Sequence, residues 1–195
     1  MLGLPLRRQF IIGPLLVFSC MILLHLFEPY SSELLGLFPA KVLDGEWWRV
    51  ITGQLLHTNL NHLLLNSSGL VLVWALHGEY YSVKHYLIVM LLCLTLVGIT
   101  LMFFANYSHY AGLSGVLHSL LIYGGIIDIT KQEKTGWLLL LGIAIKVAYE
   151  NIVGASVETE ELIGASVATE AHLIGVIVGC VVAVFYFYYQ VIRHK

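Results

Sequence analysis

Residues 111–118 read Ala-Gly-Leu-Ser-Gly-Val-Leu-His, and Ser114 stands there between two glycines, where a polar loop turns into a long apolar run. Glycines at such a point remove side-chain crowding and let the backbone approach another helix or a substrate closely. A serine that begins a helix lies beside backbone N–H groups that have no partner within the helix. The stretch therefore fits either an ordinary helix cap or a nucleophile beside an oxyanion site.

The composition is that of a membrane protein. The chain has 195 residues, of which 58% are hydrophobic and 11% charged, whereas soluble domains are about 25% charged. A net charge of -2 and the lack of a basic stripe exclude nucleic acid as a partner. The three cysteines lie in separate apolar runs, so we expect neither a disulfide nor a metal site, and no cofactor.

The apolar runs predict an all-α membrane protein that forms one transmembrane domain over residues 1–195. Runs of about 17–25 apolar residues can span a bilayer. We expect six helices, at residues 10–27, 55–76, 86–105, 113–127, 136–149 and 171–192. No small-residue cleavage pattern follows the first run, which favours a retained helix over a removed signal. Before the last run, residues 154–160 recur nearly unchanged as 164–170, which indicates a local duplication in a loop.

The basic residues predict the orientation of this bundle. Most lysines and arginines outside the apolar runs fall on one side of the predicted membrane, and only Lys41 and Arg49 fall on the other. The positive-inside rule then places both termini in the cytoplasm. Ser114 lies at the outer end of its helix.

The second predicted helix carries polar side chains that are costly in lipid and usually face the protein interior. His62 and Asn66 are four residues apart, so they project from one face. Two donors on one face suit an oxyanion hole. For His57 and Asn61 we favour a structural role, as hydrogen-bonding groups that fix the long first loop.

The last predicted helix offers a base for Ser114. His172, Gly175 and Gly179 share one face, and small residues at this spacing let membrane helices pack closely. Because His172 and Ser114 both lie at the outer end, we expect them within hydrogen-bond reach. No carboxylate is obviously placed to orient His172, since Glu170 points elsewhere. The sequence therefore predicts a Ser–His dyad and no triad.

In this combination of motifs the chain resembles the rhomboid family of intramembrane serine proteases. The resemblance covers nearly the whole chain, from the pair Trp48-Arg49 through the last helix. Its motifs are, in order, His57-x4-His62-x3-Asn66, Gly112-Leu113-Ser114-Gly115 and Ala171-His172-x2-Gly175-x3-Gly179.

The resemblance implies a six-helix rhomboid-like bundle and a role for each motif. Ser114 would be the nucleophile and His172 the general base. His62, Asn66 and the backbone N–H of Ser114 would stabilise the oxyanion, with Gly112 and Gly115 in support and His57 structural. The loop before the last helix would help to gate access from outside.

One departure points to a branch of the family. Many rhomboid proteases have a tyrosine one turn after the serine, stacked on the catalytic histidine, where this chain has His118. The run looks more like the rhombosortase branch, which implies a protein of the bacterial inner membrane, embedded in lipid, with its site open to the periplasm. Its substrates would be membrane proteins with a C-terminal Gly-Gly, a hydrophobic helix and a basic tail, cleaved by hydrolysis or by transfer to a lipid-like acceptor. His118 would either stack on His172 or compete with it as the base, and we favour His172 because its helix face is flattened by glycine.

Two rival functions remain to be weighed. A non-catalytic relative that binds and guides membrane helices would fit the fold, but the intact Ser114 and His172 argue against it. Nine histidines suggest a metal carrier. His57 and His62 are five apart, however, so they do not share a face as an i, i+4 pair of metal ligands would.

Overall fold

The computed structural model describes residues 3–104 and 107–193, and in this part of the chain the regular elements are all helical. The long helices are α1 (Arg8–Leu26), α5 (Leu60–His77), α6 (Val83–Phe104), α7 (Ser114–Thr130), α8 (Thr135–Val153) and α10 (Thr169–Arg193). The short ones are α2 (Tyr30–Leu35), α3 (Pro39–Leu43), α4 (Arg49–Thr52) and α9 (Val157–Ile163), with 3₁₀ turns η1 (Gly53–Leu55) and η2 (Gly78–Tyr80). An all-helical protein was the fold class that the sequence predicted.

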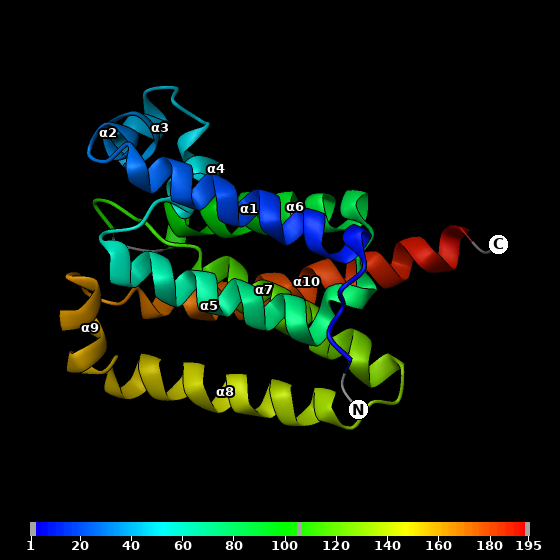
Figure 1. The fold of residues 1–195 in the computed structure, drawn as a ribbon. Helices are drawn as coiled ribbons and strands as arrows, with labels where there is room; N and C mark the ends of the chain where they lie inside the picture. Colours follow the sequence, from blue (N-terminus) through cyan, green and yellow to red (C-terminus); the bar gives the residue numbers. More distant parts are fainter. Residues whose placement is uncertain (1–2, 105–106, 194–195) are drawn as a thin grey trace.

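The long helices run side by side, and the short ones gather at one end of the bundle (Figure 1). α2, α3, α4 and α9 lie at that end, whereas both described ends of the chain lie at the opposite one. α7 occupies the centre, because it contacts α5, α6, α8 and α10. Ser114 is the first residue of α7 and lies at the end that carries the short helices.

Two helix limits differ from the sequence prediction by four residues or more. The helix expected from residue 55 begins at Leu60, because the side chain of Asn59 accepts a hydrogen bond from the backbone N–H of His62 and caps α5 there. The helix expected to end at residue 149 continues to Val153 and ends before Gly154, whose φ is +102°. A positive φ favours glycine and commonly ends a helix.

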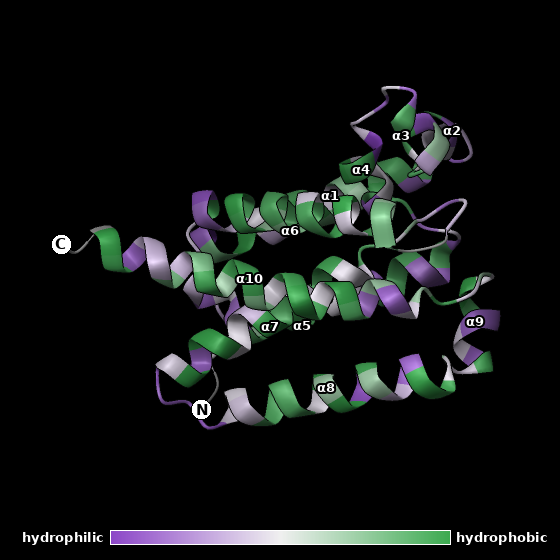
Figure 2. Ribbon diagram, turned by 180° about the vertical axis from the view of Figure 1, so that it is seen from behind, coloured by the Kyte–Doolittle hydropathy of each residue, from purple (hydrophilic) through white to green (hydrophobic). Residues whose placement is uncertain are grey.

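The outer surface of the bundle is apolar along its length. α1, α6, α8 and α10 are long and apolar enough to cross a membrane, and α7 is a shorter apolar helix. Figure 2 shows hydrophobic residues along the length of these helices, while α9 is richer in polar residues. Many large apolar side chains are exposed, such as Leu91, Leu141 and Val184, which water would penalise and lipid would not. The chain is a multi-pass membrane protein.

Arg49, the first residue of α4, holds the segment of α2 against α4. Its guanidinium is buried, and it donates hydrogen bonds to the backbone carbonyls of Gly36 and Glu33, both at 2.9 Å. The carboxylate of Glu46 lies 2.6 Å from its Nε. The segment before α5, which the sequence predicted to be a loop, is thus folded, because the Arg49 side chain satisfies two of its backbone carbonyls.

A second polar cluster closes the opposite end. The buried His77, at the end of α5, lies 3.2 Å from the carboxylate of Asp128, near the end of α7. Tyr80 donates to the same carboxylate at 2.5 Å, and Lys131 lies 3.8 Å from the centroid of the Tyr80 ring. Burial, together with this hydrogen bond, raises the pKa of Tyr80, so the phenol stays a donor. The cluster ties the C-terminal ends of α5 and α7 together.

The predicted close face of α10 is confirmed. A Cβ atom on Gly175 would lie 2.1 Å from the carbonyl oxygen of Gly115, and one on Gly179 would lie 2.5 Å from that of Ser119. The backbones of α7 and α10 therefore meet with nothing between them, as at other small-residue interfaces of membrane helices.

Gly175→Ala is expected to lower stability by about 2 kcal/mol or more, because its methyl group can be accommodated only if α7 and α10 move apart. Thermal unfolding in detergent measures the effect. The matched control is Gly142→Ala on α8, where a Cβ meets nothing within 4 Å and the better helix former should leave the midpoint unchanged or raised. Equal midpoints for the two variants would contradict the packing argument.

Candidate active site

Ser114 and His172 come together where α7 and α10 begin. Ser114 Oγ lies 3.0 Å from His172 Nε2, in position to donate its proton to that nitrogen. His172 is buried, whereas Ser114 is partly exposed. The distance follows from the helix contact, since Gly115 adjoins Ser114 and Gly175 lies one turn after His172. A serine hydroxyl paired with an imidazole in this way is the arrangement of an activated nucleophile.

The prediction that no carboxylate faces His172 is wrong. Glu150 Oε2 lies 2.8 Å from His172 Nδ1. The sequence predicted that α8 ends at residue 149, just before Glu150. In the structure this helix continues past Glu150, whose side chain points toward α10. Glu170, the acid nearest to His172 in sequence, instead accepts a hydrogen bond from the hydroxyl of Tyr107.

Lys146 belongs to the same cluster. Its Nζ lies 2.8 Å from each carboxylate oxygen of Glu150, one helical turn away, and 3.4 Å from His118 Nε2. Sequence reasoning missed this pair. The available signal was the i, i+4 spacing of two opposite charges in an apolar run, where charged groups are costly unless they have partners.

His118 stacks on His172, the first of the two arrangements considered from the sequence. The ring centroids are 4.3 Å apart and the planes differ by 21°. His118 Nδ1 lies 2.8 Å from the backbone carbonyl oxygen of Ser114, which only a protonated Nδ1 can bond. Its two ring nitrogens therefore serve the Ser114 carbonyl and Lys146, and neither serves the Ser114 hydroxyl.

His62 and Gly112 lie against each other beside Ser114. Gly112 has a φ of +122°, and a Cβ there would come within 2.8 Å of His62 Nε2, so only glycine lets the loop pass this ring. Thr58 contacts His62 Nδ1 through its backbone N–H at 3.4 Å and through its hydroxyl at 3.1 Å, which leaves Nε2 facing Gly112. Asn66 lies deeper, where its amide donates to the carbonyl of His62 and its nitrogen is 3.9 Å from the Cβ position of Gly112.

A cavity of about 260 Å³ opens above Ser114. Much of its wall is small or polar, and it includes Thr58, His62, Ala111, Ala165, Ser166 and Ala168. Residues 164–168, in the second copy of the near-repeat, form one side of it. We call these residues the covering segment.

Hydrogen bonds from the start of α5 hold the covering segment in place. Thr58 Oγ1 donates to the carbonyl of Ile163 at 2.6 Å, and the amides of Asn59 and Asn61 donate to that of Leu162, both at 3.1 Å. Asn61 was expected to fix the first loop, and it instead fixes the end of α9. The polar residues before and within α5 thus anchor the chain directly before the covering segment.

His57 supports the site by packing. Its ring is buried and meets His62 edge-on, with centroids 5.0 Å apart. Within residues 3–104 and 107–193 neither of its ring nitrogens has a hydrogen-bond partner, so the hydrogen bonds expected to fix the first loop are not seen. Burial lowers the pKa of His57 to about 3, which keeps the imidazole neutral.

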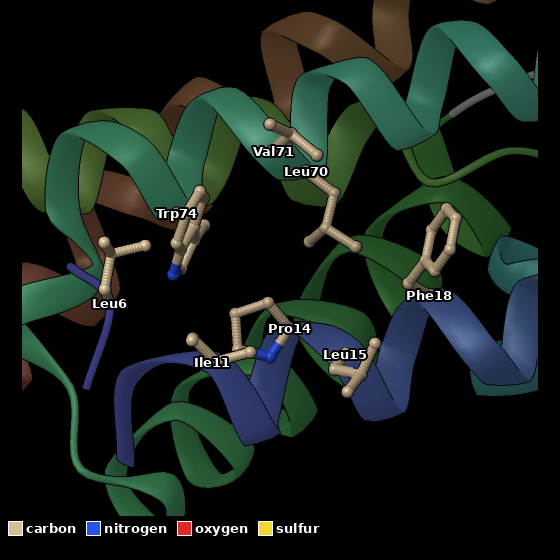
Figure 3. A pocket seen from close by; sticks show the side chains of 8 residues that line it. All are labelled: Leu6, Ile11, Pro14, Leu15, Phe18, Leu70, Val71 and Trp74. Atoms are coloured by element: carbon tan, nitrogen blue, oxygen red, sulfur yellow. The ribbon is translucent and has the colours of Figure 1, made fainter. Parts of the chain in front are cut away.

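A second cavity, of about 240 Å³, lies between α1 and α5 (Figure 3). Its wall is apolar except for the indole N–H of Trp74, and includes Pro14, Phe18 and Leu70. It contains no group that could act as a nucleophile or base, so the chemistry belongs to the cavity at Ser114. Among the described residues no three His, Cys, Asp or Glu side chains are grouped to hold a metal ion.

Asn61→Ala is expected to speed the reaction of Ser114 with a bulky fluorophosphonate probe by about two- to tenfold, the equivalent of one lost hydrogen bond. The reason is that the covering segment loses one anchor at Leu162. Labelling rates in detergent measure this effect. Ser68→Ala is the control, because Ser68 is an exposed residue of α5 that bonds only within its own helix, and an equal rise there would remove the explanation.

Comparison with known families adds one finding. The family model described as Rhomboid domain matches residues 44–189, well over half of the chain, and this region contains every residue of the cluster around Ser114. No curated protein matches the sequence.

Proposed function

We propose, on the premise that the chain belongs to the rhomboid family, that it is a serine endopeptidase acting within the membrane. Rhomboid proteins are generally intramembrane serine proteases. The observation that carries the proposal is the 3.0 Å contact between Ser114 Oγ and His172 Nε2, beneath a cavity at one end of an apolar bundle.

The geometry supports an acyl-transfer mechanism. His172 Nε2 takes the proton of Ser114 Oγ as this oxygen attacks the carbonyl carbon of the scissile peptide bond. The oxyanion that forms is stabilised by the Ser114 backbone N–H and by His62 in the tautomer that carries its proton on Nε2, with the amide of Asn66 behind them. The imidazolium then protonates the leaving amine, and an acyl-enzyme remains on Ser114.

The acyl-enzyme is resolved in the second half of the reaction. A water molecule enters from the polar end of the bundle, and His172 removes its proton as it attacks the ester. In the transfer version of the reaction, an amine of a lipid-like acceptor takes the place of water. Either nucleophile reaches Ser114 through the cavity beneath the covering segment.

We propose a rhombosortase-like substrate: a membrane protein with a C-terminal Gly-Gly, a hydrophobic helix and a basic tail. Part of the wall of the cavity at Ser114 is made of small residues, Ala111, Ala165 and Ala168, against which the backbone of a glycine pair can lie closely. A substrate helix must unwind before cleavage, because helical carbonyls are hydrogen-bonded and shielded. Glycine pairs unwind most readily. The imidazole of His118 at the stacking position also agrees with this branch.

The proposed topology has six spans, with both termini in the cytoplasm and the site open to the periplasm of a bacterial inner membrane. The start of α1 and the end of α10 lie at the same end of the bundle, opposite α9 (Figure 1). Arg7, Arg8 and Lys131 lie near that end, as the positive-inside rule expects for the cytoplasmic side.

Fluorophosphonate labelling tests the proposed nucleophile and base. We expect the wild-type protein to be labelled, Ser114→Ala and His172→Ala to be unlabelled, and His118→Ala to be labelled at a reduced rate because the stacking partner is lost. Labelling that persists in Ser114→Ala would exclude this serine. If folded wild type is not labelled while a control protease is, the chain is a non-catalytic protein that binds membrane helices.

A reporter protein tests the substrate class. We expect co-expressed wild type, and not Ser114→Ala, to cleave a reporter that ends in Gly-Gly, a hydrophobic helix and a basic tail. Replacing Gly-Gly by Leu-Leu should slow cleavage by about tenfold or more, because leucine favours the helical conformation that must unwind before cleavage. Mass spectrometry of the new C-terminus distinguishes hydrolysis from transfer, and equal cleavage of both reporters would exclude this substrate class.

A further inference from the structure

We propose that Glu150 is a positioning residue for His172, so that the site works as a Ser114–His172–Glu150 triad, with Lys146 holding the carboxylate. The inference rests on the proposed protease function. The observation behind it is that both nitrogens of His172 are engaged: Nδ1 by Glu150 Oε2 at 2.8 Å and Nε2 by Ser114 Oγ at 3.0 Å.

The carboxylate fixes the tautomer of His172. A carboxylate only accepts hydrogen bonds, so the proton of the neutral imidazole must lie on Nδ1. Nε2 then presents its lone pair to the hydroxyl of Ser114, which is the form that a general base needs. Without Glu150 the ring would be free to carry its proton on Nε2 and would offer Ser114 no acceptor.

The carboxylate also stabilises the charge that forms in the reaction. When His172 takes the serine proton, a positive charge arises on a ring whose side chain is only 7% exposed. Glu150 supplies the opposite charge at hydrogen-bond distance and is itself 16% exposed. Charges that are largely shielded from water interact more strongly than exposed ones.

Lys146 holds Glu150 in the orientation that serves His172. Its Nζ donates to both carboxylate oxygens at 2.8 Å, so the carboxylate is held in place while Oε2 also bonds His172 Nδ1. It also offsets the unfavourable placement of an acid in the last turn of α8, where the helix dipole is negative.

Lys146 and His118 together direct the proton to His172. Lys146 can donate to His118 Nε2, while His118 Nδ1 donates to the Ser114 carbonyl, so the neutral ring has both nitrogens occupied. A proton on His118 would place a second positive charge beside Lys146. Of the two stacked rings, His172 is the one that faces an acid.

The rival interpretation is that Glu150 only pairs with Lys146 along α8 and that its contact with His172 has no effect on the reaction. The two interpretations differ in rate and in pH dependence. The charged or ionisable groups that face His172 are His118 on α7, Glu150 and Lys146 on α8, and His62 on α5. Only Glu150 is an acid.

The experiment compares Glu150→Gln, Glu150→Asp and Lys146→Met with Glu158→Gln, an exposed acid of α9, as the matched control. For each full-length protein in detergent, we would measure the thermal midpoint and the rate of fluorophosphonate labelling between about pH 5 and pH 9.

Glu150→Gln should label about 10²–10⁴-fold more slowly, because the amide can hold the wrong tautomer and carries no charge. The acid limb of its pH–rate profile should move to lower pH, since the imidazolium loses its counter-charge. Glu150→Asp and Lys146→Met should fall between this variant and wild type, and Glu158→Gln should match wild type.

The proposal is overturned if Glu150→Gln folds, labels within about threefold of wild type and keeps its acid limb. Ser114-dependent labelling of wild type would still stand in that case, so the loss of the triad and the loss of the protease function are separate outcomes. If Glu150→Gln does not fold, Glu150→Asp decides: a wild-type rate and profile overturn the proposal, and a slower rate at an unchanged thermal midpoint supports it.

Discussion

The contact between the backbones of α7 and α10 is the constraint on which the site depends. Gly175 meets the carbonyl of Gly115 with no room for even a methyl group. Lipid gives helices little hydrophobic reason to associate, so close van der Waals packing of this kind must hold them together. The same contact sets the separation of Ser114 and His172, because each lies within a turn of the glycines that meet. Packing and chemistry thus share one interface.

The polar residues of the bundle are gathered at its two ends. One group, formed by His77, Tyr80 and Asp128, joins the C-terminal ends of α5 and α7. The cluster around Ser114 occupies the other end of the bundle. Between them the interior is largely apolar, with Val97, Leu120 and Tyr123 fully buried. Polar groups in a membrane are tolerated where partners satisfy them. The cluster at His77 is therefore explained by stability alone, whereas the cluster at Ser114 leaves that serine partly exposed at a cavity.

The sequence predicted those parts of the structure that a run or a regular spacing of similar residues marks. Apolar runs gave the long helices to within a few residues, and the spacing of His172, Gly175 and Gly179 indicated the face that meets α7. It missed Glu150, because helix ends are set by local turns such as that at Gly154 and not by apolarity. It also missed the folding of the segment before α5, since Arg49 binds backbone carbonyls, which no residue pattern reports.

The near-repeat adopts two conformations in one chain. In the first copy Ser156 caps α9, whose acidic first turn follows at once. In the second copy the carboxylate of Glu160 accepts from the backbone N–H of Val167 at 3.0 Å, and the next helix starts only at Thr169. One copy therefore serves as scaffold and the other as cavity wall. Because the anchors at Leu162 and Ile163 lie outside the covering segment, its side chains can be exchanged without loss of these hydrogen bonds, so the shape of the cavity wall and the framework that holds it are set by different residues.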